Sequence, residues 1–313
     1  MVFLTDLKIK GSLLGLITGD ALGFPYEFLS KEQITEPITG FMYDEHIFTD
    51  DSSMTLCTVE ALLNHGYNLQ EIGKLFQKWF NEGYWSPDGE STIGIGMGVA
   101  ESLTRMKKLN LTTNPELAGN TYELSNGNGS LMRILPIILY SLHLDDKKLL
   151  EQVHAVSSIT HAHPRSQMAC GIFALFIKKL FLNNDKRTAF VEAVSDSREY
   201  YSTIFPKEIK YFERILSCSL FKLPMEDVKT TGYVIDTLEA ALWCTLHNSN
   251  FEDTLLTAVN LGGDTDTIGA VTGALAGCLY GYSAIPQTWL NKIIRINDAT
   301  KLIDKFTNLL IES

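Results

Sequence analysis

Two short stretches of the sequence concentrate carboxylate and hydroxyl side chains. Residues 48–53 read Phe-Thr-Asp-Asp-Ser-Ser, and residues 262–267 read Gly-Gly-Asp-Thr-Asp-Thr. The apolar periodicity places a helix directly after each stretch, one over residues 54–65 and another from about Ile268. Helix capping explains either stretch alone, because Asp, Ser and Thr are preferred cap residues and carboxylates are favoured at the positive end of the helix dipole.

A cation site explains more of both stretches than capping does. A cap needs one side-chain oxygen, whereas adjacent carboxylates repel one another unless a cation lies between them. If the stretches meet in space, they contribute four carboxylates, those of Asp50, Asp51, Asp264 and Asp266. The ligands are all oxygen, without Cys or His, which favours two magnesium or manganese ions over zinc. Two such ions orient hydroxyl groups and activate water.

A third polar segment, residues 125–130, reads Ser-Asn-Gly-Asn-Gly-Ser. Asn-Gly pairs form turns, so a surface turn that ends in a serine cap is one interpretation. The alternative is an anion site, because glycines let successive backbone N–H groups converge and the helix expected from Leu131 favours a phosphate at its start. We interpret Arg133 as forming a structural pair within that helix rather than as a phosphate ligand.

The elements that must position these residues are predicted to be helices. Apolar residues recur at three- and four-residue spacing in segments such as 56–63, 72–79 and 172–180, and most prolines fall between such segments. Pro136 fits a first turn or a kink. Strand-like alternation is limited to residues 34–41. We therefore predict an all-α fold of about a dozen helices in a single domain, residues 1–313.

Two of the predicted helices carry a glycine at every fourth residue. One series is Gly11, Gly15, Gly19 and Gly23, and the other is Gly269, Gly273, Gly277 and Gly281. A glycine inside a helix costs roughly 1 kcal/mol relative to alanine, so each series needs a compensating contact. Close packing of another backbone along the smooth ridge supplies one. We expect both helices to be central and to pack on each other, the alternative being that a ridge faces small side chains elsewhere.

The composition and net charge of the chain argue against some classes of binding partner. The chain has 313 residues, 45% of them hydrophobic, and a formal net charge of −11. This is a globular composition, and the negative charge argues against a nucleic-acid polymer or an anionic membrane as partner. No charged residue occurs from Thr267 to Asn291, but the many glycines, Pro286 and Gln287 indicate a buried helix rather than a membrane span.

The cysteines and the first residues bear on the compartment. Five cysteines, an odd number without a Cys-x-x-Cys pair, predict reduced and mostly buried thiols rather than disulfides or a zinc site. Asp6 interrupts the first apolar residues, so no secretory signal is expected. We expect a cytoplasmic protein, and a monomer in preference to an oligomer.

Five motifs, taken in order along the chain, resemble those of the ADP-ribosylglycohydrolase family. They are Gly19-Asp20-Ala21-Leu22-Gly23 with Pro25 and Glu27, Thr49-Asp50-Asp51, Gly127-Asn128-Gly129-Ser130 with Met132-Arg133, Thr160-His161, and the stretch 262–267. The resemblance extends from about Gly11 to Ile285. Each motif alone is weak, whereas the ordered set is specific.

The resemblance implies a metal-dependent hydrolase that cleaves the glycosidic bond between ADP-ribose and an acceptor, a protein side chain or a small conjugate, and releases ADP-ribose. Two Mg²⁺ or Mn²⁺ ions would hold the distal ribose through its hydroxyls. The implied metal ligands are Thr49, Asp50, Asp51, Asp264, Asp266 and Thr267. The implied catalytic residues are Glu27, Asp264 and Asp266. The implied ligand-binding residues are Ser125, Gly127, Asn128, Gly129, Ser130, His161, Gly262 and Gly263.

Further residues are weaker candidates. His163 lies near His161, and the loop aromatics Tyr84, Trp85 and Tyr122 are candidates for stacking on adenine. Family members that act on ADP-ribosyl-arginine often carry Phe-Asp-Ile-Gly where residues 91–94 read Ser-Thr-Ile-Gly. Thr92 thus stands in place of a carboxylate that would pair with a guanidinium, with Asp88 and Glu90 as nearby substitutes.

Two other function classes remain open at this point. One is a non-catalytic ADP-ribose-binding or structural protein on the same scaffold, against which the complete set of six oxygen ligands argues. The other is a two-metal phosphohydrolase, which would cleave the pyrophosphate and yield AMP. The acceptor is likewise left open.

Overall fold

The computed structural model describes residues 5–183 and 185–312, and within these residues the chain forms helices and loops without any strand. The α-helices are α1 (Asp6–Gly23), α2 (Asp50–His65), α3 (Leu69–Glu82), α4 (Met97–Lys108), α5 (Leu135–Ser141), α6 (Asp146–Ser158), α7 (Pro164–Leu182), α8 (Lys186–Ile204), α9 (Glu213–Leu216), α10 (Val234–His247), α11 (Phe251–Asn260), α12 (Thr265–Tyr280), α13 (Gln287–Leu290) and α14 (Ile296–Glu312). The all-α prediction is confirmed. That residues 1–313 form one domain stays a prediction.

Short 3₁₀ turns connect several of the helices. They are η1 (Phe24–Tyr26), η2 (Leu111–Thr113), η3 (Pro115–Leu117), η4 (Leu131–Arg133), η5 (Ile209–Phe212), η6 (Ser219–Phe221), η7 (Met225–Asp227) and η8 (Tyr282–Ala284). The extended piece expected at residues 34–41 is absent, because this segment is part of a long irregular loop between η1 and α2.

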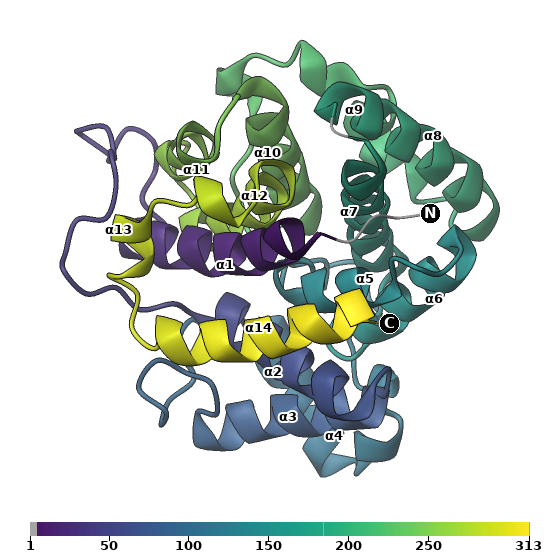
Figure 1. Cartoon of the computed structure of the whole chain (residues 1–313). Helices are drawn as coiled ribbons and strands as arrows, with labels where there is room; N and C mark the ends of the chain where they lie inside the picture. The colour runs from purple at the N-terminus through teal and green to yellow at the C-terminus, as the bar shows by residue number, and fades with distance from the viewer. Residues whose placement is uncertain (1–4, 184, 313) are drawn as a thin grey trace.

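The centre of the molecule is the contact between α1 and α12 (Figure 1). A Cβ built on Gly11 would lie 2.6 Å from the carbonyl oxygen of Gly277, and Gly15 and Gly19 face Gly273 and Gly269 still more closely. The two helices are therefore antiparallel, and they touch backbone to backbone. The prediction that the glycine ridges pack on each other is confirmed.

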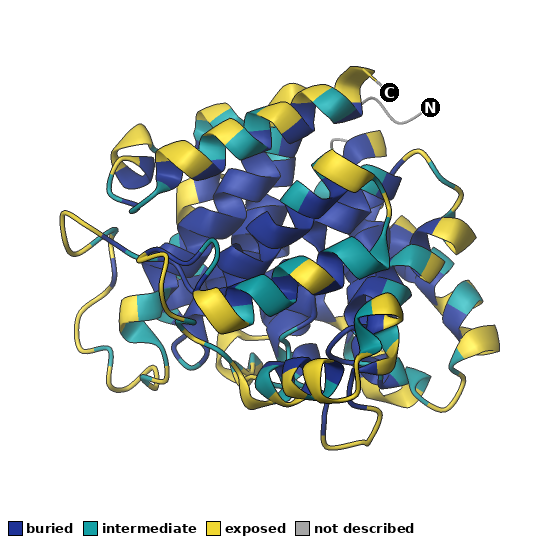
Figure 2. Cartoon of the chain, turned by 90° about the horizontal axis from the view of Figure 1, so that it is seen from below, coloured by how far each residue is buried: buried dark blue, intermediate teal, exposed yellow. Residues whose placement is uncertain are grey.

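The other helices cover this central pair. Helices α10 and α11 pack on α12, α14 and α2 pack on the side of α1, and α5 to α8 form the flank nearest the described chain ends (Figure 1). From Ile9 to Gly23, every residue of α1 except Lys10 is buried, and the exposed residues lie on the outer helices and the long loops (Figure 2). The surrounding helices thus hold the backbones of α1 and α12 in place.

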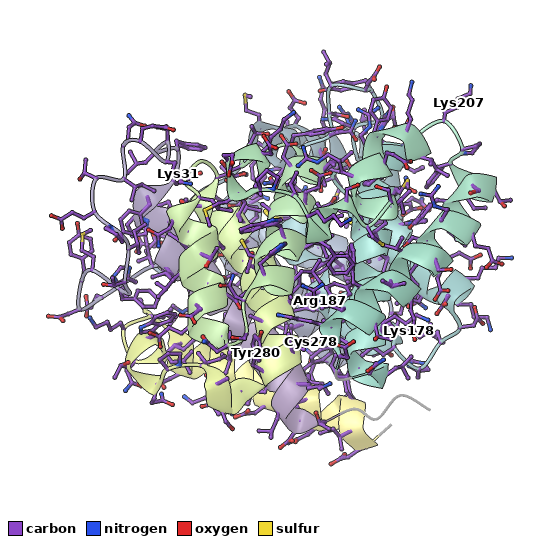
Figure 3. All side chains as sticks on the ribbon, turned by 90° about the horizontal axis from the view of Figure 1, so that it is seen from above. Lys31, Lys178, Arg187, Lys207, Cys278 and Tyr280 are labelled. Atoms are coloured by element: carbon purple, nitrogen blue, oxygen red, sulfur yellow. The ribbon has the colours of Figure 1, made fainter. Side chains whose placement is uncertain are left out.

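The uncharged stretch is the buried helix α12 and the segment that follows it. The helix ends before Gly281, whose φ of 79° breaks the helical path. Figure 3 shows Cys278 and Tyr280 at this C-terminal end, whereas Lys31 lies at the opposite side of the molecule, near the loop that precedes α12. No helix of residues 5–183 and 185–312 is long and apolar enough to cross a membrane. All five cysteines are free, and four of them are buried.

Both helices that follow the acidic stretches begin earlier than predicted. Helix α2 starts at Asp50 rather than at residue 54, and α12 starts at Thr265 rather than near Ile268. The apolar pattern marks the first buried residues, whereas carboxylates are themselves favoured in the first turn. By contrast, no α-helix starts at Leu131. The turn η4 comes first, and α5 starts at Leu135 with Pro136 in its first turn, as predicted for that proline.

The glycine contact predicts an unusual response to alanine. Gly273→Ala should lower the free energy of unfolding by about 3 kcal/mol, because the new methyl group would overlap the backbone of Gly15, which has no side chain to move aside. Helix propensity alone predicts the opposite sign, with alanine better by roughly 1 kcal/mol. Denaturant unfolding followed by circular dichroism measures the difference.

The control for this variant is Ala100→Gly in the half-buried first turn of α4, which reports the propensity effect in reverse. It should cost about 1 kcal/mol. A Gly273→Ala protein that is as stable as the unmodified chain would contradict the backbone contact.

Candidate functional site

The acidic stretches meet at the N-terminal ends of α2 and α12. The antiparallel contact places the end of α1, and Glu27 just beyond it, beside the start of α12. Carboxylate oxygens of Glu27, Asp264 and Asp266 lie within 4.8 Å of one another. Asp50 of the first stretch lines the same cavity as Asp264 and Asp266 of the second. The positions of these three carboxylates therefore support the hypothesis that the two stretches form one cluster.

Asp20 on α1 fastens α2 to this cluster. Its carboxylate accepts hydrogen bonds from the backbone N–H groups of Thr49 and Ser52, each at 3.0 Å, and from both of their hydroxyl groups. It therefore supplies the N-terminal cap of α2 from a different helix. Burial is the main cause that raises the pKa of Asp20 to about 6, although the hydrogen bonds act in the opposite direction. The sequence offers no signal for this role of Asp20 except its place in the first motif.

The capping interpretation fails for the residues that it was meant to explain. Thr49 precedes α2 and Asp264 precedes α12, but neither side chain makes a capping hydrogen bond to its helix. The Thr49 hydroxyl lies 3.1 Å from Asp51 Oδ2, and the amide of Asn128 donates to Asp264 Oδ2 at 2.6 Å. The Thr49 side chain thus contacts carboxylates rather than backbone N–H groups of α2, and the Asp264 side chain is bound by Asn128 rather than by the N–H groups of α12.

The electrostatics of the cluster suit a cation. Burial, followed by repulsion from neighbouring carboxylates, raises the pKa of Asp50, Asp51 and Asp266 well above the usual range. Burial and the charges of Asp264 and Asp20 raise the pKa of Glu27 to about 7. The Oδ1 atom of Asp51 is buried without any hydrogen-bond partner among the described residues. Such an oxygen is costly to bury, and a hard cation satisfies both the orphaned atom and the repulsion.

The cluster opens into a cleft of about 840 Å³. Its walls come from the loop after α1, the segment before α4, α4 itself, the segment 120–132 and the loop before α12. The predicted site residues that line it are Glu27, Asp50, Ser125, Gly127, Asn128, Gly129, His161, Asp264, Asp266 and Thr267. Thr49 and Asp51 lie behind this surface, buried against Asp20 and the other carboxylates.

The predicted anion loop lines the cleft only in part. Gly127, Asn128 and Gly129 face the cleft, whereas Ser130 does not. The Ser130 hydroxyl is fully buried and accepts a hydrogen bond from Ser157 at 2.9 Å. The predicted contact of Ser130 with a ligand, and the helix start behind it, therefore need correction. The motif placed Ser130 with its cleft-lining neighbours, whereas its hydroxyl bonds to Ser157 of the distant helix α6.

Gly262 and Gly263 hold the site together without lining the cleft. Both have a positive φ, 73° and 81°. The N–H of Phe28 donates to the carbonyl of Gly263, and the N–H of Gly263 donates to the carbonyl of Leu29, each at 2.7 Å. The chain just after Glu27 is thereby bound to the chain just before Asp264. Their predicted role as ligand-binding residues is replaced by this positional one.

Among the weaker candidates, the structure separates Tyr122 and Thr92 from the rest. Both line the cleft, and the Tyr122 hydroxyl lies 3.2 Å from Glu101 on α4. The Tyr84 hydroxyl and the Trp85 indole N–H instead donate hydrogen bonds to the Glu60 carboxylate, and neither residue lines the cleft.

The remaining candidates, His163, Asp88 and Glu90, do not line the cleft. His163 accepts a hydrogen bond from the backbone of Arg165 and caps α7. Asp88 and Glu90 are not among the residues that line the cleft, and the Asp88 carboxylate is occupied by the N–H groups of its own turn.

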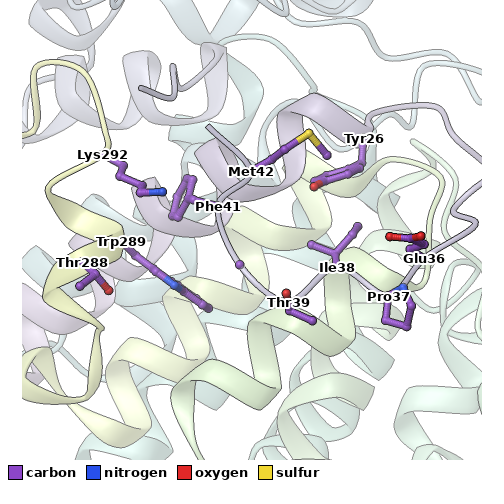
Figure 4. A pocket seen from close by; sticks show the side chains of 11 residues that line it. Tyr26, Glu36, Pro37, Ile38, Thr39, Phe41, Met42, Thr288, Trp289 and Lys292 are labelled. Carbon is purple, nitrogen blue, oxygen red and sulfur yellow. The ribbon is translucent and has the colours of Figure 1, made fainter. Parts of the chain in front are cut away.

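A second cavity, of about 430 Å³, lies between the long loop after η1 and α13 (Figure 4). Tyr26, Phe41 and Trp289 are among its walls, and none of the predicted site residues lines it. The acidic cluster therefore belongs to the larger cleft, and we place the site there.

Comparison with known proteins shows which family the chain is similar to. The family model described as ADP-ribosylglycohydrolase matches residues 4–312. The ADP-ribosylarginine hydrolase Tri1 of Serratia proteamaculans is 30% identical over 307 residues, which are 95% of this chain and 78% of that protein. The ADP-ribosyl-dinitrogen reductase glycohydrolase of Rhodospirillum rubrum is 28% identical, over 91% of this chain and 90% of that protein. A solved structure described as an ADP-ribosylglycohydrolase-related protein complex matches with a TM-score of 0.79 and 27% identity, over 97% of this chain and 98% of that chain.

The cluster makes a prediction about stability. Asp51→Asn removes one charge from a group of buried carboxylates that repel one another, so in the presence of a chelator it should raise Tm, by roughly 2–4 °C for each kcal/mol of repulsion removed. The same variant should lose most of the rise in Tm that Mg²⁺ or Mn²⁺ gives the unmodified protein through binding to the folded state. Thermal unfolding with and without the ion measures both effects.

The control is Asp44→Asn, which changes the same residue type at a fully exposed position. It should leave both values of Tm nearly unchanged. Full stabilisation of the Asp51→Asn protein by the ion would speak against Asp51 as a ligand.

Proposed function

This chain belongs to the ADP-ribosylglycohydrolase family, and on that premise we propose that it hydrolyses the glycosidic bond between ADP-ribose and an acceptor, releasing ADP-ribose. The observation that carries the proposal is the shared cleft. One cavity of about 840 Å³ contains the acidic cluster, the glycine loop of residues 127–129 and His161. A ligand that contains a ribose, a pyrophosphate and a glycosidic bond to be cleaved needs these groups close to one another.

We propose that the cluster holds two Mg²⁺ or Mn²⁺ ions, with Thr49, Asp50, Asp51, Asp264, Asp266 and Thr267 as ligands. The donors are all oxygen, which suits these hard ions. The orphaned Oδ1 of Asp51 and the crowded carboxylates support the assignment. When bound, such ions supply positive charge that orients hydroxyl groups and activates water.

The proposed catalytic residues of the chain itself are Glu27, Asp264 and Asp266. Glu27 lines the cleft with a pKa raised to about 7, so its carboxyl group can take up or give a proton near neutral pH. Cleavage at the anomeric carbon develops positive charge on the sugar, which the carboxylates of Asp264 and Asp266 stabilise. Asn128 keeps Asp264 in place through its hydrogen bond to Oδ2.

We propose that the backbone of Gly127 and Gly129, together with Ser125, Asn128 and His161, contacts the rest of ADP-ribose. The protein has a net charge of −11, so an anionic ligand needs local compensation. Cations in the cluster and N–H donors in the wall provide it. We further propose that the enzyme is a single-domain monomer of the cytoplasm, and the five free cysteines support the choice of compartment.

Asp264→Asn tests the activity directly. The variant loses a charge from the cluster, so the release of ADP-ribose in the presence of Mg²⁺ should fall roughly a hundredfold or more. Mass spectrometry of the products, with Asp44→Asn as control, measures the loss. AMP as the product of the unmodified protein would sink the proposal in favour of a phosphohydrolase, and unchanged turnover of the Asp264→Asn protein would sink the role of Asp264.

Thr92 tests the acceptor. Relatives are named for arginine-linked ADP-ribose, whereas Thr92 lines the cleft without a charge. A carboxylate binds a guanidinium through paired hydrogen bonds, so Thr92→Asp should raise kcat/KM for arginine-linked substrate roughly tenfold relative to serine-linked substrate. Thr92→Asn is the uncharged control. A panel of arginine-, serine- and nucleobase-linked substrates measures the ratio, and an equal effect of both variants would contradict this role.

A further inference from the structure

His161 presents one edge of its ring to the cleft and the other to the protein interior. It lies between α6 and α7 and is almost fully buried. On the inner edge, Nδ1 lies 2.9 Å from the hydroxyl oxygen of Thr160. The outer edge, with Nε2, faces Gly98, Gly127 and Gly129, all of which line the cleft, and Nε2 has no hydrogen-bond partner among the described residues.

Behind Thr160 lies a buried arginine without a counter-ion. The Arg133 side chain is fully buried, and its guanidinium donates to the Thr160 hydroxyl oxygen at 2.7 Å. It also stacks over the ring of Phe76 at 4.5 Å. Within residues 5–183 and 185–312, no carboxylate lies within 4.0 Å of it. Its hydrogen-bond partners, Val156 and Thr160, lie outside the helix that follows it, so the expected pair within that helix is not formed.

The direction of these hydrogen bonds follows from counting protons. A guanidinium has only donors, so the Thr160 oxygen must accept from Arg133. The single hydroxyl hydrogen of Thr160 then has one available acceptor, which is Nδ1 of His161. The opposite assignment, with the proton on Nδ1, leaves the Thr160 hydrogen buried without an acceptor, and such unpaired groups are costly.

We propose that Arg133 and Thr160 are positioning residues that fix the tautomer of His161 with its proton on Nε2, so that the cleft presents a neutral N–H donor to an anionic oxygen of the ligand. The inference rests on the proposed function for the identity of that oxygen, which belongs to the pyrophosphate of ADP-ribose. It does not rest on that function for the tautomer, which is a property of the protein alone.

The surroundings keep the ring neutral as well as oriented. Burial, assisted by the positive charge of Arg133, lowers the pKa of His161 to about 3. The imidazole therefore binds the ligand through a directed hydrogen bond and not through its own charge. The positive charge lies deeper, on Arg133 behind the Thr160 hydroxyl, where it forms no ion pair with a carboxylate of the described residues.

The tautomer is measured by ¹H–¹⁵N correlation spectroscopy of protein labelled at histidine, with His161→Gln to identify the resonances. At pH 7 we expect a proton on Nε2 of His161, an unprotonated Nδ1, and a change in the Nε2–H signal when ADP-ribose is added. A proton on Nδ1, or on both nitrogens, would overturn the inference. Because the ligand-free protein decides this point, a failure to bind or hydrolyse ADP-ribose refutes the proposed function separately.

A pair of variants tests the role of Thr160. Thr160→Val keeps the shape but removes the hydroxyl, so the fixed tautomer should be lost and ADP-ribose should bind roughly tenfold more weakly. Thr160→Ser retains the hydroxyl and should restore both the Nε2–H signal and the affinity. A purely structural role for Thr160 predicts no change of tautomer in either variant, and that result would overturn the proposal. Should Thr160→Val fail to fold, Thr160→Ser and the unmodified protein still decide it, since loss of the Nε2–H signal in the serine variant is incompatible with the proposal.

Discussion

The backbone contact between α1 and α12 is the constraint on which the site depends. No side chains lie between the two glycine ridges, and Gly15 faces Gly273 while Gly19 faces Gly269. A shift by one residue would bring side chains into a space that holds none. This register sets the end of α1 against the beginning of α12, and so decides which carboxylates share the cleft. The glycine repeat therefore brings together Glu27 and Asp264, which are more than 200 residues apart in the chain.

The buried acids near this contact have two different tasks. The Asp20 carboxylate accepts four hydrogen bonds from Thr49 and Ser52, and these bonds hold α2 in place. Asp51, which lies between these two donors in the sequence, has an oxygen that nothing in the described chain satisfies. A protein that buries both kinds of carboxylate in one place uses the first to position the second. The same arrangement recurs with opposite charge on the far wall, where Arg133 orients Thr160 and leaves the ligand-facing donor to His161.

Reasoning from the sequence succeeded where a local pattern has a physical meaning. Apolar periodicity predicted helices, the glycine spacing predicted a close helix pair, and paired acidic stretches predicted a shared cluster. It failed where the partner of a residue is remote. The composition of residues 125–130 does not indicate that the Ser130 hydroxyl forms a hydrogen bond with α6. The Gly262-Gly263 pair likewise does not indicate that Gly263 forms hydrogen bonds with the chain after Glu27. Such partners depend on which helices become neighbours, and a single sequence does not encode that in any nearby residue.

The two hydrogen bonds between Gly263 and the segment Phe28–Leu29 have a thermodynamic consequence. They tie the loop that carries Glu27 to the loop that carries Asp264, so the two cannot change conformation independently. Whatever free energy a cation contributes by drawing in Asp264 is shared with the ordering of Glu27, and by reciprocity the position of Glu27 changes the affinity for the cation. In the proposed enzyme, binding of a cation at Asp264 and binding of a ligand beside Glu27 are therefore coupled equilibria, with these two peptide hydrogen bonds as the link.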